Sequence, residues 1–306
     1  MNGYFFYLHN TASIFGNRNF KGWGRKRSGR FASLCKKVFG GHTILFEDGF
    51  IRSLGLGVDG SPSFSIVEDD IGIYYDATVP SKLENLLNGY DFKADEALMK
   101  TTHKAMRLIR EHHISKYNHA PYVDEVFRWK HGLDEEKKRV LIVAQTAGDA
   151  SLEYGLAGKF TTVEMITDAL RENPGTDVYL KVHPDVLTGK KKSDISLGEI
   201  PPECRIIDED VNPISLMEHF DTVYTKTSGM GMEALILGKE VHTYGMPFYA
   251  GWGLTHDKLS CQRRKRKLKT EELFAAAYIL YIRYYNPYRK HPSDILDMIE
   301  EIVRHR

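Results

Sequence analysis

The stretch from Thr222 to Thr255 reads TVYTKTSGMGMEALILGKEVHTYGMPFYAGWGLT. It opens with the β-branched and aromatic residues of a strand, passes through Thr227-Ser228-Gly229 and continues from Met230 to Leu237 as a predicted helix closed by Gly238. Unpaired N–H groups and the positive end of the helix dipole favour an anion at such a helix start. Glu233 lies in the first turns, where its carboxylate could accept hydrogen bonds from a ribose. This strand–loop–helix unit therefore predicts a nucleotide site.

The same stretch permits a second interpretation. The letters GMGMEA at 229–234 match a dinucleotide-binding fingerprint, and they follow a strand and open a helix as that fingerprint requires. The fingerprint also needs an acidic residue about 20 positions on, but residues 245–249 read GMPFY. A second match, GLGVDG at 55–60, leads into a strand-like run and is interpreted as a turn. The other alternative is an ordinary strand–loop–helix unit without a ligand.

Composition limits the class of protein. A chain of 306 residues with 42% hydrophobic residues is long enough for two domains of ordinary size, and its net charge of +1 argues against a general nucleic-acid binder. The three cysteines, Cys35, Cys204 and Cys261, form no CxxC pair, so we expect no disulfide framework, no zinc site and a reducing compartment. The sequence shows neither a signal peptide nor an apolar run of about 18 residues. We expect a soluble or peripheral protein of the cytoplasm.

Short apolar strands alternate with amphipathic segments along the chain, which predicts α/β units around a mainly parallel sheet. In the first half we expect strands at 4–8, 43–46 and 71–75 and a long helix at 95–113. The charged stretch 134–139 is interpreted as a linker, and TTVE at 161–164 predicts a capping box for a helix that ends near 173–175. The strands expected in the second half are 140–143, 178–182, 222–225 and 240–244.

Ligands bind outside the carboxyl ends of the strands in open α/β sheets, and this rule sorts the candidate residues. The groups that follow the first three strands of the second half are Gln145, Asp149 and Ser151, then Lys181, His183 and Pro184, then Thr227, Ser228, Gly229 and Glu233. We expect these three groups to converge on one edge of the sheet. Taken singly, His183 also fits a histidine at a strand end, and Asp149 fits a turn residue.

Motifs spread over the chain resemble those of one family. In order they are GWGRKRSG (22–29), EDGFIRSLGLG (47–57), SKYNHAP (115–121), QTAGDAS (145–151), KVHPD (181–185), TSGMGMEA (227–234), GMPFYAGWGLT (245–255) and the basic run before LKTEELF (268–274). The sequence resembles the KpsC-like capsule polysaccharide β-Kdo glycosyltransferases. The resemblance implies an α/β, GT-B-like fold in which two Rossmann-like domains face a central cleft. Many relatives carry two transferase modules in one polypeptide, whereas this sequence resembles a single module.

The resemblance also implies domains, substrates and partners. It divides the chain into an acceptor-side domain (1–135), a CMP-sugar-binding domain (136–270) and C-terminal helices (271–306) that pack back toward the first domain. The implied reaction moves Kdo from CMP-Kdo to a Kdo-terminated, lipid-linked acceptor with retention, in synthesis of a capsule polysaccharide linker. The implied partners are CMP-Kdo, a Kdo-containing glycolipid, the cytoplasmic membrane surface and other capsule assembly proteins. Transfer of another CMP-linked nonulosonic acid and a nucleotide-binding module without catalysis stay open as alternatives.

The implied chemistry assigns roles to the candidate residues. CMP is a good leaving group, so cationic and N–H groups at Lys181, His183 and the 227–229 loop suffice without a general acid. Retention through a double displacement requires a carboxylate nucleophile, for which we predict Asp149. The Glu47-Asp48 pair is the predicted base, because neighbouring carboxylates in a closed site raise the pKa of one of them. The alternative for this pair is a turn after a strand.

The remaining candidate residues are cationic or polar, and we expect them to bind the acidic sugars of donor and acceptor. We expect Arg52 to hold a Kdo carboxylate in a bidentate contact. Gln145 and Ser151 are expected to contact the sugar. Arg25 and Lys26 either bind the anionic acceptor or lie in a mobile surface loop.

Three further clusters carry weaker expectations. The basic run RRKRK at 263–267, followed by the apolar segment 273–285, predicts contact with an anionic leaflet at about 1 kcal/mol per cation. Its alternative is a solvated loop before a core helix that returns to the first domain. The acidic runs at 68–70 and 208–210 are expected to be solvated turns. No metal or other cofactor is expected, because His112, His113 and His119 lack the spacing of ligands on one helical face.

Overall fold

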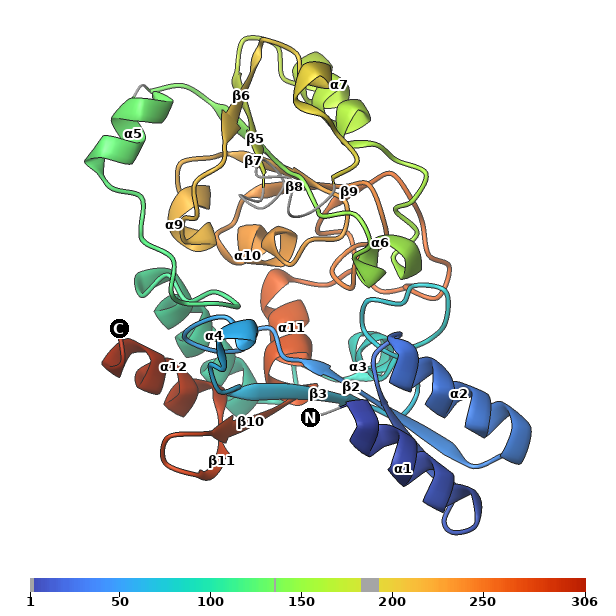
Figure 1. The fold of residues 1–306 in the computed structure, drawn as a ribbon. Coiled ribbons are helices and arrows are strands. Elements are labelled where there is room, and N and C mark those ends of the chain that lie inside the picture. Colours follow the sequence, from blue (N-terminus) through green and yellow to red (C-terminus); the bar gives the residue numbers. More distant parts are fainter. Residues whose placement is uncertain (1–2, 135, 183–192) are drawn as a thin grey trace.

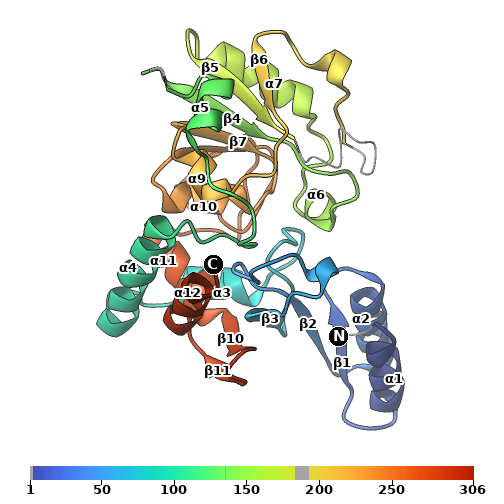
Figure 2. The same ribbon diagram turned by 60° about the vertical axis from the view of Figure 1, so that its left-hand side comes forward.

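The computed structural model describes residues 3–134, 136–182 and 193–306. Figure 1 and Figure 2 show two α/β domains, each built around its own sheet, with the C-terminal end of the chain returning to the first domain. Within the described residues, none of the helices combines the length and the apolar character that crossing a bilayer requires.

The first sheet has five strands in the order β1-β2-β3-β10-β11. They are β1 (Asn19–Trp23), β2 (His42–Asp48), β3 (Ser65–Asp69), β10 (Ile282–Asn286) and β11 (His291–Ser293). Only β1 and β2 pair in parallel, while the other three neighbouring pairs are antiparallel. The strand expected at 43–46 is confirmed as part of β2, but this sheet is mixed and not mainly parallel as predicted.

The helices of the first domain pack around this sheet (Figure 1). They are α1 (Gly3–Ile14), α2 (Arg27–Phe39), α3 (Lys82–Gly89), α4 (Glu96–Glu111), α11 (Thr270–Phe274) and α12 (Ile295–Arg304), with a 3-10 turn η1 (Gly57–Asp59). Helices α1 and α2 pack on β1, and α12 packs on β10 and α4. The long helix expected at 95–113 is confirmed as α4, and η1 confirms the turn expected at 55–60.

Two strands predicted in this domain are wrong. Residues 4–8 belong to α1, where the Asn10 side chain exchanges hydrogen bonds of 2.8 and 2.7 Å with the backbone of Lys21 in β1. A short apolar run does not distinguish a strand from a buried helix segment. Residues 71–75 form a turn, because the Asp69 carboxylate accepts the N–H groups of Ile71 and Gly72 at 2.9 and 2.8 Å. A strand would need these N–H groups for its own ladder.

The two acidic runs are bound within the protein and are not simply solvated turns. Asp69 is fully buried and also accepts the Tyr281 hydroxyl at 2.8 Å. Glu209 lies 3.1 Å from His131 Nε2 and forms an ion pair with Lys130. Both carboxylates therefore stabilise local packing.

The second sheet has six strands, all parallel, in the order β6-β5-β4-β7-β8-β9. They are β4 (Arg139–Val143), β5 (Asp177–Lys181), β6 (Cys204–Ile207), β7 (Thr222–Thr225), β8 (Glu240–Thr243) and β9 (His256–Asp257). This is the 3-2-1-4-5-6 order of nucleotide-binding sheets, in which the winding direction reverses between β4 and β7. The four strands predicted in this half are confirmed.

Local signals account for the helices of the second domain. Thr161 and Glu164 form the predicted capping box of α7, and Asn212 caps α9 with a proline at the next position. The helix predicted from Met230 is confirmed as α10. The helices are α5 (Glu125–His131), α6 (Ala150–Tyr154), α7 (Thr162–Glu172), α9 (Pro213–Met217) and α10 (Met230–Ile236), with a 3-10 turn η2 (Leu197–Glu199).

The C-terminal segment was expected to contain only helices. After α11 it continues as a π-helical turn, η3 (Ala275–Leu280), and then forms β10 and β11 before α12. Ile282 of β10 lies opposite Val67 of β3, so the segment supplies two of the five strands of the first sheet. It is therefore an integral part of the first domain.

An aromatic contact and an ion pair join the two domains. Phe248 of the second domain stacks on Phe50 of the first, with ring centroids 4.6 Å apart. Arg264, whose side chain is 4% exposed, pairs with Glu84 of α3 at 3.3 Å and donates to the Ala250 carbonyl at 2.6 Å. These contacts place residues 247–250 of the 245–255 motif in the interior of the molecule.

Internal contacts also engage part of the basic run 263–267. Arg263 pairs with Glu84 at 2.7 Å, and Arg266 donates to the Tyr90 carbonyl at 2.7 Å. Three of the five cations, including Arg264, are thus bound within the protein, whereas Lys265 and Lys267 are exposed. The segment that follows is buried, as the alternative interpretation expected.

Candidate active site between the two domains

The carboxyl ends of β4 and β7 meet where the strand order reverses. Gln145, just after β4, accepts the backbone N–H of Thr227 at 2.8 Å and donates from Nε2 to the Thr227 hydroxyl at 3.1 Å. The hydroxyls of Ser151 and Thr227 lie 3.0 Å apart. Three residues predicted from two strands therefore converge at the topological switch point, where open sheets bind their ligands.

The loop from Thr227 to Gly229 leads directly into α10, as predicted. The Ser228 carbonyl accepts the Tyr249 hydroxyl at 2.6 Å, and a Cβ on Gly231 would lie 2.2 Å from that hydroxyl oxygen. Glycine at 231 thus allows Tyr249, which is fully buried, to pack against the start of the helix. The aromatic residues of the 245–255 motif support the loop from the interior of the domain.

Asp149 stands at the start of α6, the short helix that follows β4. Its Oδ1 accepts the backbone N–H of Ser151 at 2.9 Å, so the side chain caps this helix. Gly148 precedes it with a φ of +84°, a conformation that favours glycine. The Asp149 side chain is exposed. The predicted nucleophile is therefore held in a defined orientation on the surface of the second domain.

Glu47 ends β2 in the first domain. The indole Nε1 of Trp23 donates to its Oε1 at 2.8 Å. Burial raises the pKa of Glu47 against the opposing charge of two nearby lysines, and the neighbouring Asp48 makes the smallest contribution. Asp48 itself pairs with Arg52 at 2.9 Å. The direction of the predicted shift is confirmed, but its main cause is burial and not the adjacent carboxylate.

The two candidate carboxylates face the same region between the domains. Burial raises the pKa of the Tyr74 hydroxyl, and the charges of Glu47 and Asp149 raise it further. This effect requires carboxylates from both domains to lie near one hydroxyl. The domains are also in direct contact here, because the Ala77 N–H donates to the Tyr154 carbonyl of α6 at 2.9 Å. Glu47 and Asp149 therefore lie on opposite domains close to the Tyr74 hydroxyl.

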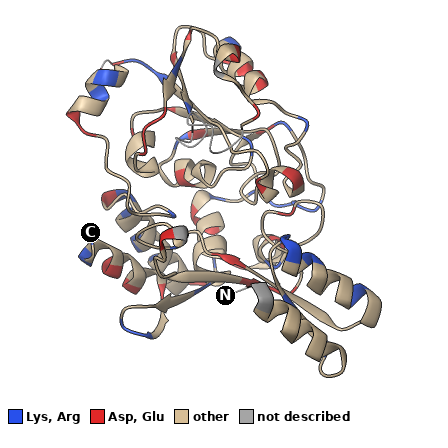
Figure 3. Cartoon of the chain, in the orientation of Figure 1, with Lys and Arg blue, Asp and Glu red and all other residues tan. Residues whose placement is uncertain are grey.

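Arg25 and Lys26 lie at the edge of this site. The Arg25 guanidinium pairs with Asp76 at 2.6 Å and lies 5.7 Å from the centre of the Tyr154 ring in α6. The Arg25 backbone N–H donates to the Tyr75 hydroxyl at 2.7 Å. Lys26 is exposed at the start of α2, where basic residues gather on the side toward α6 (Figure 3). The segment is a fixed turn, in contrast to the mobile loop that was the alternative.

Two cations with predicted substrate roles are bound to the protein itself. Arg52 donates to the Ser61 carbonyl at 3.3 Å in addition to its pair with Asp48. Lys181 donates to the Glu209 carbonyl at 2.9 Å, which turns its amine toward the loop after β6. The other predicted residues at this strand end, His183 and Pro184, lie outside the described residues.

Glu233 joins the two domains. Its Oε1 accepts the Ser115 hydroxyl at 2.5 Å. Burial raises its pKa to about 7, although hydrogen bonds from Ser115 and from the backbone of Lys116 oppose the shift. The sequence predicted a contact between Glu233 and a ribose. In this structure the carboxyl group closes the contact between α10 and the SKYNHAP motif instead.

Sequence analysis missed three residues of the site, namely Trp23, Tyr74 and Lys116. The charge of Lys116 lowers the pKa of both Glu47 and Glu233, so its amine lies near both carboxyl groups. Trp23 lies within the motif GWGRKRSG, and Lys116 lies within SKYNHAP. Their presence in these motifs was the only feature of the sequence that could have identified them as site residues. Tyr74 lies outside every motif and carries no comparable signal.

Fold and site together define a class of protein. A parallel sheet of nucleotide-binding order faces a second α/β domain, and polar side chains from two of its strands converge at the switch point. This is a GT-B-like architecture, the arrangement found in many glycosyltransferases.

The chain belongs to the capsule polysaccharide biosynthesis protein family, which it matches over residues 22–284. Among solved structures it is similar to the β-Kdo 2,4-transferase of KpsC from Thermosulfurimonas dismutans, with a TM-score of 0.85 and 45% identity over 93% of this chain and 86% of that chain. It is also similar to the β-Kdo 2,7-transferase of the same KpsC, with a TM-score of 0.73 and 30% identity over 97% and 88% of the two chains.

The curated relatives are longer than this chain. The capsule polysaccharide modification protein LipA of Neisseria meningitidis is 43% identical over 295 residues, which cover 92% of this chain and 40% of LipA. The lipopolysaccharide-processing protein LpsZ of Rhizobium meliloti is 40% identical over 238 residues, which cover 78% of this chain and 53% of LpsZ. The chain therefore spans about half the length of these relatives, or less.

Proposed function

We propose that this protein is a glycosyltransferase that moves Kdo from CMP-Kdo to a Kdo-terminated acceptor, with retention of configuration, in capsule polysaccharide synthesis. Its similarity to two β-Kdo transferases of KpsC supports the choice of sugar. The observation that carries the proposal is the contact of Gln145, Ser151 and Thr227 at the switch point of the parallel sheet, beside the hydrogen bond from Ala77 to Tyr154 that joins the two domains.

The nucleotide of the donor is proposed to bind at the contact between Gln145 and Thr227. The Thr227 and Ser228 hydroxyls lie just before α10, where they can offer hydrogen bonds to a phosphate near the positive end of the helix dipole. Arg25, which lies over the Tyr154 ring of α6, and the exposed Lys26 add positive charge from the opposite domain. CMP leaves as a stable anion, so these groups suffice in the proposed reaction without a metal cofactor.

Asp149 is the proposed nucleophile. Its carboxylate attacks the anomeric carbon of Kdo, and the bond from that carbon to the phosphate oxygen breaks, with its electron pair leaving on CMP. This displacement inverts the configuration and leaves Kdo as an ester of Asp149. The exposure of the side chain and its fixed orientation at the start of α6 support this role.

Glu47 is the proposed base of the second displacement. The acceptor hydroxyl gives its proton to the Glu47 carboxylate while its oxygen attacks the anomeric carbon, and Asp149 leaves as a carboxylate. Two inversions give net retention. The raised pKa makes Glu47 a stronger base than an exposed glutamate, and the hydrogen bond from Trp23 fixes its orientation.

A lipid-linked acceptor would place this reaction at the cytoplasmic membrane surface. Lys265 and Lys267 are the exposed cations of the basic run, and so they are the residues proposed to contact an anionic leaflet. Replacing both by glutamine should weaken binding to vesicles of anionic lipid by about 1 kcal/mol per residue, and added salt should weaken binding of the parent. Equal vesicle binding by parent and variant would remove this run from the proposal.

The direct test is transfer in vitro. The chain is incubated with CMP-Kdo and a synthetic acceptor that ends in Kdo, and the product is analysed by mass spectrometry and by NMR of the new linkage. We expect one added Kdo in the configuration of the donor. The matched control is Asp149→Asn, because asparagine can still cap α6 but cannot form the ester. An inverted product, or transfer only from a different CMP-linked sugar, would contradict the proposal.

A further inference from the structure

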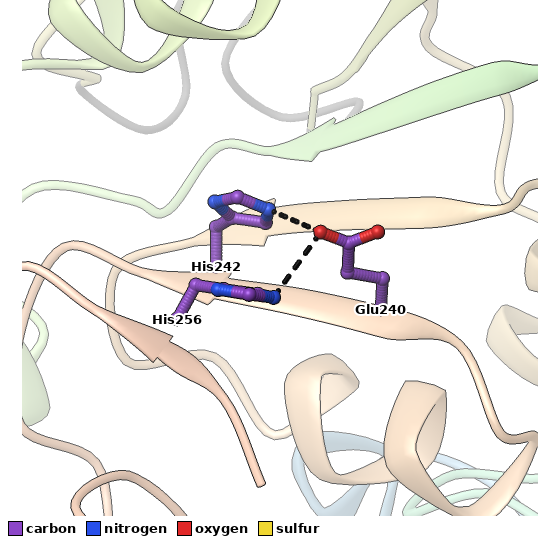
Figure 4. Close-up of side chains that lie close together, drawn as sticks. All are labelled: Glu240, His242 and His256. Atoms are coloured by element: carbon purple, nitrogen blue, oxygen red, sulfur yellow. Dashed lines mark hydrogen bonds and ion pairs between the residues drawn. The ribbon is translucent and has the colours of Figure 1, made fainter. Parts of the chain in front are cut away.

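Glu240, His242 and His256 point toward one another at the edge of the second sheet (Figure 4). Glu240 and His242 are two positions apart on β8, so their side chains share one face of the sheet. His256 lies directly opposite His242 in the register between β8 and β9. The cluster therefore rests on backbone that the sheet holds in place.

The distances within this cluster are those between the ligands of one metal ion. Glu240 Oε1 lies 3.0 Å from His242 Nε2 and 3.2 Å from His256 Nε2, and all three ligand atoms lie within 4.8 Å of one another. Zinc bonds to imidazole nitrogen and carboxylate oxygen are about 2.0–2.1 Å, so tetrahedral ligands are about 3.3 Å apart. The two distances from Glu240 Oε1 to the imidazole nitrogens are within a few tenths of an ångström of this spacing.

A second carboxylate stands behind His242, as it does in many metal sites. Glu172 Oε2 lies 3.8 Å from His242 Nδ1 and accepts the Tyr224 hydroxyl at 2.8 Å. The Tyr224 ring also stacks on His242, with centroids 4.2 Å apart and an interplanar angle of 9°. A carboxylate near the second ring nitrogen selects the tautomer that leaves Nε2 free to bind a metal. Tyr224 and Glu172 thus orient the imidazole independently of Glu240.

The charge around the cluster favours a cation. Glu172 and Asp168 of α7 pair with Lys258, and Arg171 pairs with both carboxylates. With Glu240 included, the cluster and its surroundings hold three carboxylates and two cationic side chains. One net negative charge therefore remains when the imidazoles are neutral, which is the form that binds a metal.

We propose that Glu240, His242 and His256 bind a divalent transition-metal ion, with zinc as the best match to two imidazoles and one carboxylate. The Glu240 and His256 side chains are 52% and 64% exposed, so water can occupy a fourth position. The role is structural and independent of the proposed sugar transfer. The ion would fasten β9 to β8, and Asp257, next to His256, accepts the Gly251 N–H at 2.8 Å and so ties the same strand to the 245–255 motif.

Metal titration of the whole chain tests this site. After treatment with a chelator and its removal, we expect one zinc ion to bind per chain and to raise the melting temperature by several degrees. Cobalt(II) in the same site should give the strong visible absorption of tetrahedral coordination. His256→Gln and Glu240→Gln should each weaken zinc binding at least 10-fold, and Glu172→Gln should weaken it by about 10- to 100-fold.

The matched control is His103→Gln, which removes an exposed histidine from α4 and should leave zinc affinity unchanged. A test without substitutions uses diethyl pyrocarbonate, where zinc should protect His256 but not His103 from modification, as read by peptide mass spectrometry. The proposal is overturned if zinc affinity is the same in His256→Gln and Glu240→Gln as in the parent, or if zinc gives His256 no protection.

Discussion

Asp149 and Glu47 reach the same region of the molecule from contrasting surroundings. Asp149 is exposed, lies in a turn after a parallel strand and accepts a backbone N–H at the start of a helix. Glu47 ends a strand of the mixed sheet, an indole N–H holds its carboxylate, and burial raises its pKa. Two carboxyl groups in such different environments can take different roles in one reaction. The exposed carboxylate is then suited to act as a nucleophile, and the buried one, with its raised pKa, is suited to accept and release a proton. The two domains thus supply different chemistry to one site.

Removing the carboxylate of Asp149 should reduce the rate of Kdo transfer more than any other substitution predicted below. In Asp149→Ala we expect the rate of Kdo transfer to fall at least about 1000-fold, equivalent to about 4 kcal/mol of barrier, because no covalent intermediate can form. CMP should still raise the melting temperature, since Gln145 and Thr227 are unchanged. Asp149→Asn separates chemistry from helix capping, and near-parental turnover in that variant would leave Asp149 as a turn residue.

Removing the carboxylate of Glu47 should affect the second displacement. We expect Glu47→Gln to slow transfer by about 100-fold, within the range for loss of a general base. The Kdo ester of Asp149 should then accumulate, and intact-protein and peptide mass spectrometry would locate it. Because the pKa of Glu47 is raised, the parent should lose activity on the acid side at a higher pH than an ordinary glutamate would give. An unchanged acid limb in Glu47→Gln, or an adduct on another residue, would reject this assignment.

Glu233 extends the comparison to a third carboxyl group, one buried where the domains touch. Its pKa is raised to about 7, so the folded chain binds a proton that the unfolded chain has already released. The stability it contributes is therefore full below about pH 4.5 and is lost as the pH rises through about 7, by up to about 3 kcal/mol. Glu233→Gln should remove this pH dependence, measured by urea unfolding at pH 5 and pH 8. The exposed Glu203→Gln serves as control, and a pH profile shared by parent and Glu233→Gln would contradict the assignment.

The smallest expected effect concerns the nucleotide side of the site. CMP at about 100 times its Kd should stabilise the parent by about 2.7 kcal/mol. Thr227→Val removes the hydroxyl that contacts Gln145 and Ser151, and should weaken CMP by about 1 kcal/mol, or about fivefold. Thermal unfolding with CMP, UDP and NAD would measure both effects. Equal stabilisation by NAD would favour the dinucleotide interpretation.

Four of the six strands of the second sheet were predicted from the sequence, whereas in the first sheet only β2 was. Each strand at 140–143, 178–182, 222–225 and 240–244 carries its own apolar run and is followed closely by its own turn or helix signal, so local patterns were enough. In the first domain, β3 pairs with β10 from the far end of the chain, and no local pattern specifies such a pairing. The residues 71–75 were predicted as a strand from their short apolar run, but the Asp69 carboxylate binds the N–H groups of Ile71 and Gly72 that a strand would use.

The candidate site divides in the same way. The convergence of Gln145, Ser151 and Thr227 followed from the rule for parallel strands, and the structure confirms it. The burial of Glu47 and the bonds that engage Arg52 depend on contacts between distant segments, and residue spacing does not report them. The zinc-type cluster also escaped prediction, since His242 and His256 are far apart in sequence and meet only through strand pairing.

The return of the chain to the first sheet has a consequence for how the protein is made. Tyr281 and Asp69, hydrogen-bonded where β10 joins β3, are 212 positions apart in the sequence. The strands of the second domain follow one another along the chain, so this domain can fold while the ribosome is still adding β10. Limited proteolysis of chains stalled before residue 275 should find the second domain protected and the first domain open to cleavage. The first domain is then completed after the second, because its sheet needs β10 to pair with β3.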